Sequence, residues 1–168
     1  MLLSACSVET TTTPAAAPAG PAAKPVASPA AAPVESPKPP ADVDMDAAIQ
    51  ALMAKAEQPD EKIEMQHILI AFKGVPRVTN VSRSMDEAKA LAQKVYAEAI
   101  GGGDFDALVK QHTNDSWPGI YPIAKASRTD WAKSFGDVGF RLKVGEIGVA
   151  PWDTTASPFG WHIIKRLK

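Results

Sequence analysis

The sequence predicts an α+β domain in which a small antiparallel sheet is packed by helices. Stretches with the period of a strand or of a helix follow one another in the order β-α-α-β-α-β-β between residues 60 and 168. A Pro- and Ala-rich stretch precedes them, which leaves roughly 110–125 residues for one modest core. The net charge is −1 and no long basic run occurs, so we expect no nucleic-acid-binding surface.

The first 43 residues are expected to lie outside this domain. Residues 1–6 end in Leu-Ser-Ala-Cys, which resembles the lipobox of bacterial lipoproteins, so Cys6 is a candidate lipidation site and residues 1–6 a remnant of an export signal. An ordinary cytosolic N-terminus is the alternative. Residues 7–43 hold nine of the fifteen prolines, and this composition predicts a disordered linker. With a single cysteine, the chain forms no intrachain disulfide.

The folded part is expected to begin with a short helix over residues 44–59. Acidic residues crowd its start, Ile49 and Leu52 share a face, and Pro59 ends it. A strand follows within residues 61–74, and its centre, residues 67–72, is apolar on both faces, as is typical of a central strand. His67 lies in this apolar centre.

The clearest local signal is the helix after Ser84. Ser84 and Glu87 have capping-box spacing, and three glycines at 101–103 end the helix. Asp104 can then cap a second helix that carries Phe105, Leu108 and Val109.

The remaining elements are shorter. We expect a strand at residues 120–124, a helix with Trp131 and Phe135 at positions i and i+4, and a turn at Val144–Gly145. A strand near residues 147–150, a turn, and a final strand complete the order. His162 lies in that final strand, apolar on both faces like the strand of His67.

Two histidines in the two most apolar strands allow several interpretations. If the strands are adjacent, the imidazoles would stack or hydrogen-bond across the pair. Each could instead be a satisfied core residue. A metal site built from His67, His112, His162 and Asp115 is a third interpretation, but no closely spaced histidine pair supports it.

From residue 63 to residue 168 the chain resembles the parvulin-type peptidyl-prolyl cis-trans isomerases. The resemblance rests on "QHILI" at 66–70, "GGGDFDALVKQHTND" at 101–115, "FGDVGFRLKVGEI" at 135–147 and "FGWHIIKRL" at 159–167, in the family's order. It implies a parvulin-like domain over residues 60–168, no cofactor and no metal. It also implies catalytic roles for His67, Asp115, His162 and Ser157, and a proline pocket lined by Tyr121, Trp131, Phe135 and Phe159.

One motif departs from the family pattern. The usual Gly-Gly-Asp-Leu-Gly segment is here "WPGIYPIA", with Tyr121 near the Leu position. A non-catalytic parvulin-like chaperone or peptide-binding module is therefore the alternative function. The loop after the first strand has only scattered basic residues, Lys73, Arg77 and Arg83, with Ala71 where a basic residue would be expected, so we expect no phosphate requirement.

The expected clients are unfolded or newly exported polypeptides that contain Xaa–Pro bonds, and the expected state is a monomer. If Cys6 is lipidated, the chain is anchored in the bacterial cell envelope, preferably on the periplasmic face of the outer membrane. If Cys6 is not lipidated, a cytoplasmic location is the alternative.

Overall fold

Two long central strands organise the molecule. In the computed structural model, which describes residues 43–168, β1 (Lys62–Ile70) pairs with β4 (Trp161–Arg166), and β2 (Ile120–Ala124) and β3 (Ile147–Ala150) form the edges. The order β2-β1-β4-β3 is antiparallel throughout. The predicted fold class is therefore confirmed. Cys6 and the predicted linker up to residue 42 lie outside the described residues.

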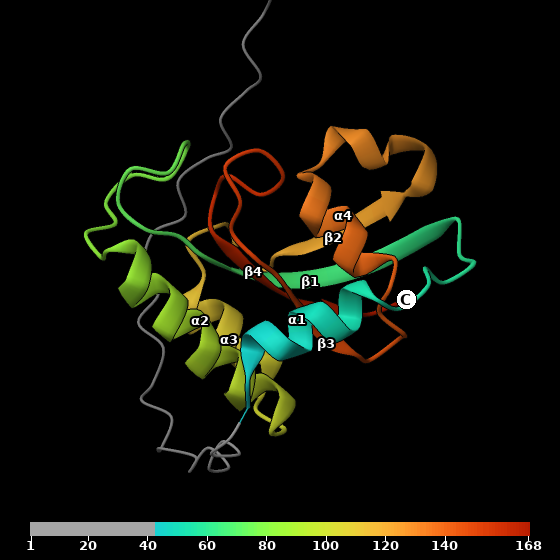
Figure 1. Cartoon of the computed structure of the whole chain (residues 1–168), viewed down its shortest axis with the longest axis horizontal. Helices are drawn as coiled ribbons and strands as arrows, with labels where there is room; N and C mark the ends of the chain where they lie inside the picture. Colours follow the sequence, from blue (N-terminus) through green and yellow to red (C-terminus); the bar gives the residue numbers. More distant parts are fainter. Residues whose placement is uncertain (1–42) are drawn as a thin grey trace, which may run out of the picture. The chain divides into compact units, whose positions relative to one another are not determined.

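Helices cover both faces of this sheet (Figure 1). On one face α2 (Met85–Ile100) and α3 (Phe105–His112) pack against Ile68, Ile70 and Ile163. On the other face α4 (Lys133–Gly139) packs against Met65 and Ile164. Successive strand side chains alternate between faces, and this alternation divides the apolar residues of β1 and β4 between two cores.

The helix α1 (Met45–Met53) lies against β3 and contributes to both cores. Met45 is fully buried in the first core, and Leu52 is buried in the second. The helix ends before Pro59, several residues earlier than the predicted range of 44–59. No helix among residues 43–168 has both the length and the apolar character that a bilayer crossing requires.

The predicted start and end of α2 are confirmed. The Ser84 hydroxyl accepts a hydrogen bond from the Glu87 N–H at 3.2 Å, and the Glu87 carboxylate accepts one from the Ser84 N–H at 2.7 Å. This reciprocal capping box satisfies two N–H groups that a helix start leaves free. The predicted cap of α3 is also confirmed, because the Asp104 side chain accepts hydrogen bonds from backbone N–H groups at the start of that helix.

The region before α4 differs from the prediction. A 3₁₀ segment, η1 (Lys125–Asp130), precedes α4, and Trp131 has extended backbone between the two helices. The prediction that Trp131 and Phe135 are neighbours on one helix is therefore wrong. Arg128 pairs with Asp137 of α4 and, at 2.8 Å, with Glu57 of the segment after α1, so it ties η1 to both.

Candidate active site

The two strand histidines meet in the middle of the sheet. In the β1–β4 register Leu69 lies opposite His162 and His67 lies opposite Ile164, so both imidazoles are on the same face. Their Nδ1 atoms are 3.1 Å apart, and the rings stack with centroids 5.2 Å apart and an interplanar angle of 19°. Both side chains are buried. Of the interpretations left open by the sequence, a directly paired arrangement is the one that the structure has.

Asp115 extends this pair towards solvent. It lies just after α3, and its Oδ2 is 3.0 Å from His67 Nε2. The backbone N–H of Ser116 donates to its other carboxylate oxygen at 2.7 Å. The hydrogen bond from His67 is the largest cause that lowers the pKa of Asp115 to about 2, so the group is a carboxylate that only accepts hydrogen bonds at neutral pH.

An ionised Asp115 limits where the protons lie in this chain of groups. His67 Nε2 must carry the proton that it shares with Asp115. Burial, together with repulsion from His67, lowers the pKa of His162 to about 3, so His162 is neutral at neutral pH. The two facing Nδ1 atoms of His67 and His162 share a second hydrogen bond, and His67 Nε2–H donates to Asp115. The buried His162 Nε2 has no hydrogen-bond partner among the described residues.

A pocket of about 330 Å³ opens over these three groups. Its lining includes all four predicted pocket aromatics: Tyr121, Trp131, Phe135 and Phe159. Phe135 lies edge-on to His67, with ring centroids 5.1 Å apart, and Trp131 contacts both Phe135 and Tyr121. Such a pocket offers an apolar concave surface beside a few polar groups, which is the usual form of a small-ligand site.

Tyr121 has a second role that its aromatic ring does not predict. Its hydroxyl donates to Asp115 Oδ2 at 3.1 Å, the same oxygen that His67 approaches. Its ring is edge-on to His67, with centroids 5.3 Å apart. Tyr121 lies in the segment that differs from the family motif, and its hydroxyl is hydrogen-bonded to the polar groups of the site.

Ser157, for which the resemblance implies a catalytic role, does not join the histidine network. Its side chain is fully buried, but its hydroxyl donates to the Gly160 carbonyl at 3.2 Å, and it makes no hydrogen bond to His67 or His162. The isolated bridge between Ser157 and Asp153 explains this position, because it turns the loop back on itself before β4. Ser157 shapes the backbone next to Phe159.

Several further residues define the surroundings of the pocket. Arg77 lines it and lies over the Phe159 ring, 5.6 Å from the centroid, and Asn114 and Asp130 also line it. Of these three residues the sequence had singled out only Arg77, as a scattered basic residue of the loop after β1. His112, at the end of α3, is not among the lining residues.

The basic residues of the loop after β1 do not act together. Arg83 donates to the Asn114 side chain at 2.8 Å and to the Ala71 carbonyl at 3.1 Å, which ties the loop to the segment after α3. Asn114 in turn accepts from the Ala71 N–H at 3.0 Å. Arg77 is the one member of the predicted basic set (Lys73, Arg77 and Arg83) that lines the pocket.

A family model and a curated relative both match this chain. A family model described as PPIC-type PPIASE domain matches residues 48–168. The foldase protein PrsA 1 of Lactobacillus johnsonii is 32% identical over 102 residues, which are 58% of this chain and 33% of that protein. This chain thus spans about a third of the length of that relative.

Two solved structures are similar in fold. The peptidyl-prolyl isomerase ESS1 of Candida albicans is 19% identical, with a TM-score of 0.57 over 74% of this chain and 73% of that chain. The solution structure of TbPIN1 is 24% identical, with a TM-score of 0.52 over 65% of this chain and 99% of that chain. At these identities the likeness concerns the fold.

Proposed function

Because this chain belongs to the family of PPIC-type peptidyl-prolyl isomerase domains, we propose that it isomerises the Xaa–Pro bonds of unfolded polypeptides in the aromatic pocket over His67. One observation carries the proposal: apolar rings line a small pocket that also contains the hydrogen-bonded set Asp115, His67 and His162. The apolar rings provide a surface that can hold the pyrrolidine ring of proline. The hydrogen-bonded groups lie beside the position of the amide that twists.

The reaction requires little chemistry from the protein. The partial double bond of an Xaa–Pro amide resists rotation with a barrier of about 18–20 kcal/mol, and no covalent bond is broken when it turns. A thousandfold acceleration needs about 4 kcal/mol of selective stabilisation of the twisted state. Apolar burial, loss of water from the amide and one or two preorganised polar groups can provide that amount.

The residues divide into two roles. Trp131, Phe135 and Phe159 hold the proline ring. Asp115 faces the amide; as a carboxylate it cannot donate a hydrogen bond, so it acts through its negative field beside a carbonyl carbon that becomes more positive as conjugation is lost. His67 and His162 hold Asp115 in place through the hydrogen-bonded chain from His162 to His67 to Asp115 and are positioning residues.

The test is a protease-free measurement of cis/trans exchange by NMR on a tetrapeptide with one Ala–Pro bond. We expect His67→Ala and Asp115→Ala to lower kcat/KM at least about tenfold, while far-UV circular dichroism stays unchanged. Asp86→Asn, which removes an exposed carboxylate at the start of α2, is the matched control and should retain the wild-type rate. Wild-type rates in both site variants would refute the assignment.

A non-catalytic binding module is the second candidate. The observation that favours it is the hydroxyl of Tyr121, which occupies an acceptor site of Asp115 that a substrate amide would otherwise meet. This candidate predicts that proline peptides bind with measurable Kd but that the wild-type protein leaves their exchange rate unchanged. The same NMR experiment reports both quantities.

We also propose that the clients are newly exported proteins and that Cys6 anchors the chain in a bacterial envelope membrane. The lipobox-like residues 3–6 and the foldase relative support this proposal. Expression in a bacterial host with a labelled fatty acid tests it: the label should appear on the wild-type chain and disappear in Cys6→Ser. An unlabelled wild-type chain in the soluble fraction would contradict the anchor.

A further inference from the structure

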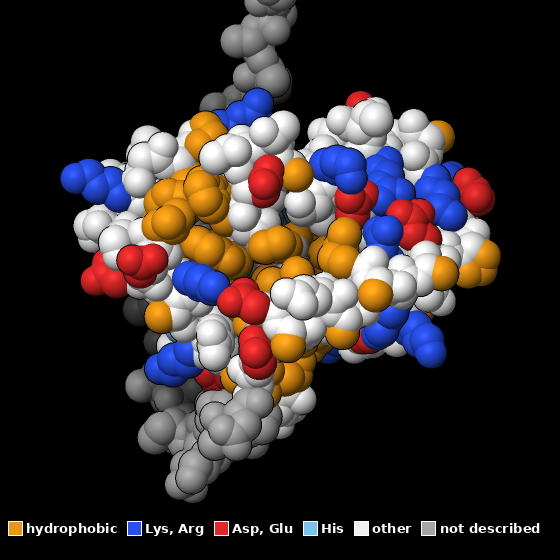
Figure 2. Space-filling model, viewed as in Figure 1, with side chains coloured by type: hydrophobic (Ala, Val, Ile, Leu, Met, Phe, Trp, Pro, Cys, Tyr) orange, Lys and Arg blue, Asp and Glu red, His pale blue; other side chains and the backbone are white. Residues whose placement is uncertain are grey.

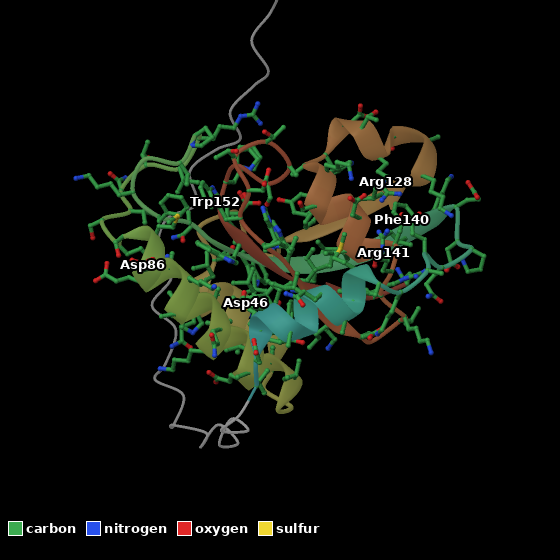
Figure 3. All side chains as sticks on the ribbon, viewed as in Figure 1. Asp46, Asp86, Arg128, Phe140, Arg141 and Trp152 are labelled. Carbon is green, nitrogen blue, oxygen red and sulfur yellow. The ribbon has the colours of Figure 1, made fainter. Side chains whose placement is uncertain are left out.

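A second hollow lies beside the proline pocket and shares no lining residue with it. This aromatic groove has a volume of about 270 Å³. One wall contains Phe72, Val75 and Pro76, and the other contains Trp152, Thr154 and Pro158. Figure 2 shows hydrophobic side chains gathered on this part of the surface, where Figure 3 labels Trp152.

The groove has an aromatic base. Phe72 meets Trp152 edge-on with centroids 5.3 Å apart, and the buried Trp161 lies behind both, with its centroid 6.0 Å from Phe72 and 6.4 Å from Trp152. Phe72 and Trp152 are themselves only half-buried. No charged side chain lines the groove. Two partly exposed aromatic side chains on a rigid base provide the kind of surface that apolar side chains bind.

Backbone hydrogen bonds hold both walls in place. In the Trp152 wall, Asp153 and Ser157 exchange two of them, at 3.2 and 3.1 Å. The Asp153 carboxylate accepts from the backbone N–H groups of Thr155 and Ala156 at 2.8 and 2.7 Å, so it is used within its own loop. In the other wall, Lys73 N–H donates to the Arg83 carbonyl at 2.9 Å. The groove is therefore preformed.

The same two segments also form one side of the proline pocket. Val75 and Pro76 line the groove, and the next two residues, Arg77 and Val78, line the pocket. Pro158 lines the groove, and the next residue, Phe159, lines the pocket. Phe72 and Phe159 pack against one apolar cluster that contains Leu69 and Val75. A polypeptide bound in the proline pocket would therefore extend next to the groove.

We propose that this groove binds an apolar side chain, preferably aromatic, of the same client polypeptide whose proline occupies the pocket. The inference rests on the proposed function, because continuity with the proline pocket identifies the occupant. An exposed aromatic side chain a few residues from a proline marks an unfolded chain. The groove therefore makes the domain select unfolded clients over short or folded ones.

The test uses the full chain and a series of labelled, uncharged 20-residue peptides. Each contains one Ala–Pro bond, and an apolar Phe-Leu-Phe triplet is moved in steps from two to eight residues away, on either side; a Ser-Gly-Ser triplet is the reference. At the best spacing we expect the apolar triplet to tighten Kd about fivefold to tenfold, as for burial of roughly half of one aromatic side chain.

A matched pair of variants locates the effect. Thr154→Glu places a carboxylate in the groove, and Thr155→Glu places the same charge one exposed residue away, outside the groove. We expect Thr154→Glu to abolish the gain from the apolar triplet and Thr155→Glu to keep it, with tetrapeptide kcat/KM unchanged in both. Equal Kd values for the two variants, or no gain at any spacing in the wild-type chain, would overturn the proposal.

A proline-free peptide with the same triplet separates this inference from the proposed function. It should shift the indole N–H resonance of Trp152 more than that of Trp131, which lines the proline pocket. Resonance shifts confined to Trp131 would contradict the proposal that the groove binds the apolar triplet. A wild-type chain that shows the Trp152 shift but no tetrapeptide isomerisation would refute the catalytic proposal alone.

Discussion

Acid should destabilise this fold through one buried imidazole. Burial lowers the pKa of His162 to about 3, while an unfolded chain would protonate the same group with a pKa near its ordinary value of 6.5. Between these two values the unfolded state binds one proton more than the folded state. The free energy of unfolding therefore falls as the pH drops from about 6.5 towards 3.

The expected size follows from the two pKa values. At pH 4.5 the unfolded chain has His162 protonated and the folded chain has it neutral, two pH units below the unfolded value. Each unit corresponds to about 1.4 kcal/mol, and so the step from pH 7 to pH 4.5 should remove about 2.5 kcal/mol of stability through this group. Asp115 does not contribute in this range, because its folded pKa is about 2 and its ordinary value is 3.8.

The assay is urea unfolding of the wild type and of His162→Phe at both pH values. The variant removes the titrating group, so we expect the loss of stability on acidification to be smaller by about 2.5 kcal/mol than in the wild type, whatever the variant costs at pH 7. His112→Gln is the control, and it should leave most of the wild-type pH dependence in place. Equal acid sensitivity of the wild type and His162→Phe would refute the reasoning.

Three further predictions concern single positions. Tyr121→Phe removes a donor to Asp115, so the pKa of that carboxyl should rise from about 2 and kcat/KM should fall by about threefold to tenfold; an NMR titration that leaves this pKa unchanged would contradict the contact. Gly160→Ala should cost more than about 2 kcal/mol, because Gly160 has φ +140° and a Cβ there would lie 2.3 Å from a carbonyl oxygen of β1. Gly145→Ala, at φ +84° with open space around it, should cost about 1 kcal/mol, and equal thermal shifts would disprove this contrast. Ser84→Ala should lose about 1 kcal/mol in urea unfolding while Ser84→Asp retains stability, and an unaffected Ala variant would mean that the capping box adds nothing.

Elements that depend on neighbouring residues were predictable from the sequence. The capping box at Ser84 and Glu87 and the glycines after α2 are local signals, and the structure has that helix as expected. The apolar centres of β1 and β4 indicated that both strands are central, and they pair directly. Residue types alone left open whether His67 and His162 meet, and the register between β1 and β4 brings them together.

The contacts that the sequence did not reveal depend on the three-dimensional arrangement of the segments. Trp131 has extended backbone between η1 and α4, and the nearby Arg128 pairs with Glu57, 71 residues earlier in the chain. The Ser157 hydroxyl donates to a carbonyl of its own loop, and the Tyr121 hydroxyl donates to Asp115 in the segment after α3. These contacts depend on loop conformation and on how segments pack, and hydrophobic periodicity carries no information about either.

The position of β4 has a consequence for synthesis. This strand follows every other described element in the chain, yet it lies between β1 and β3 and supplies one of two imidazoles that are 95 residues apart. Until residues 161–166 have left the ribosome or a translocation channel, β1 and β3 have no common neighbour and Asp115 and His67 face an unfinished sheet. Non-local pairing of this kind folds slowly. The candidate site therefore forms only after residues 161–166 have emerged, later than every other described element of the domain.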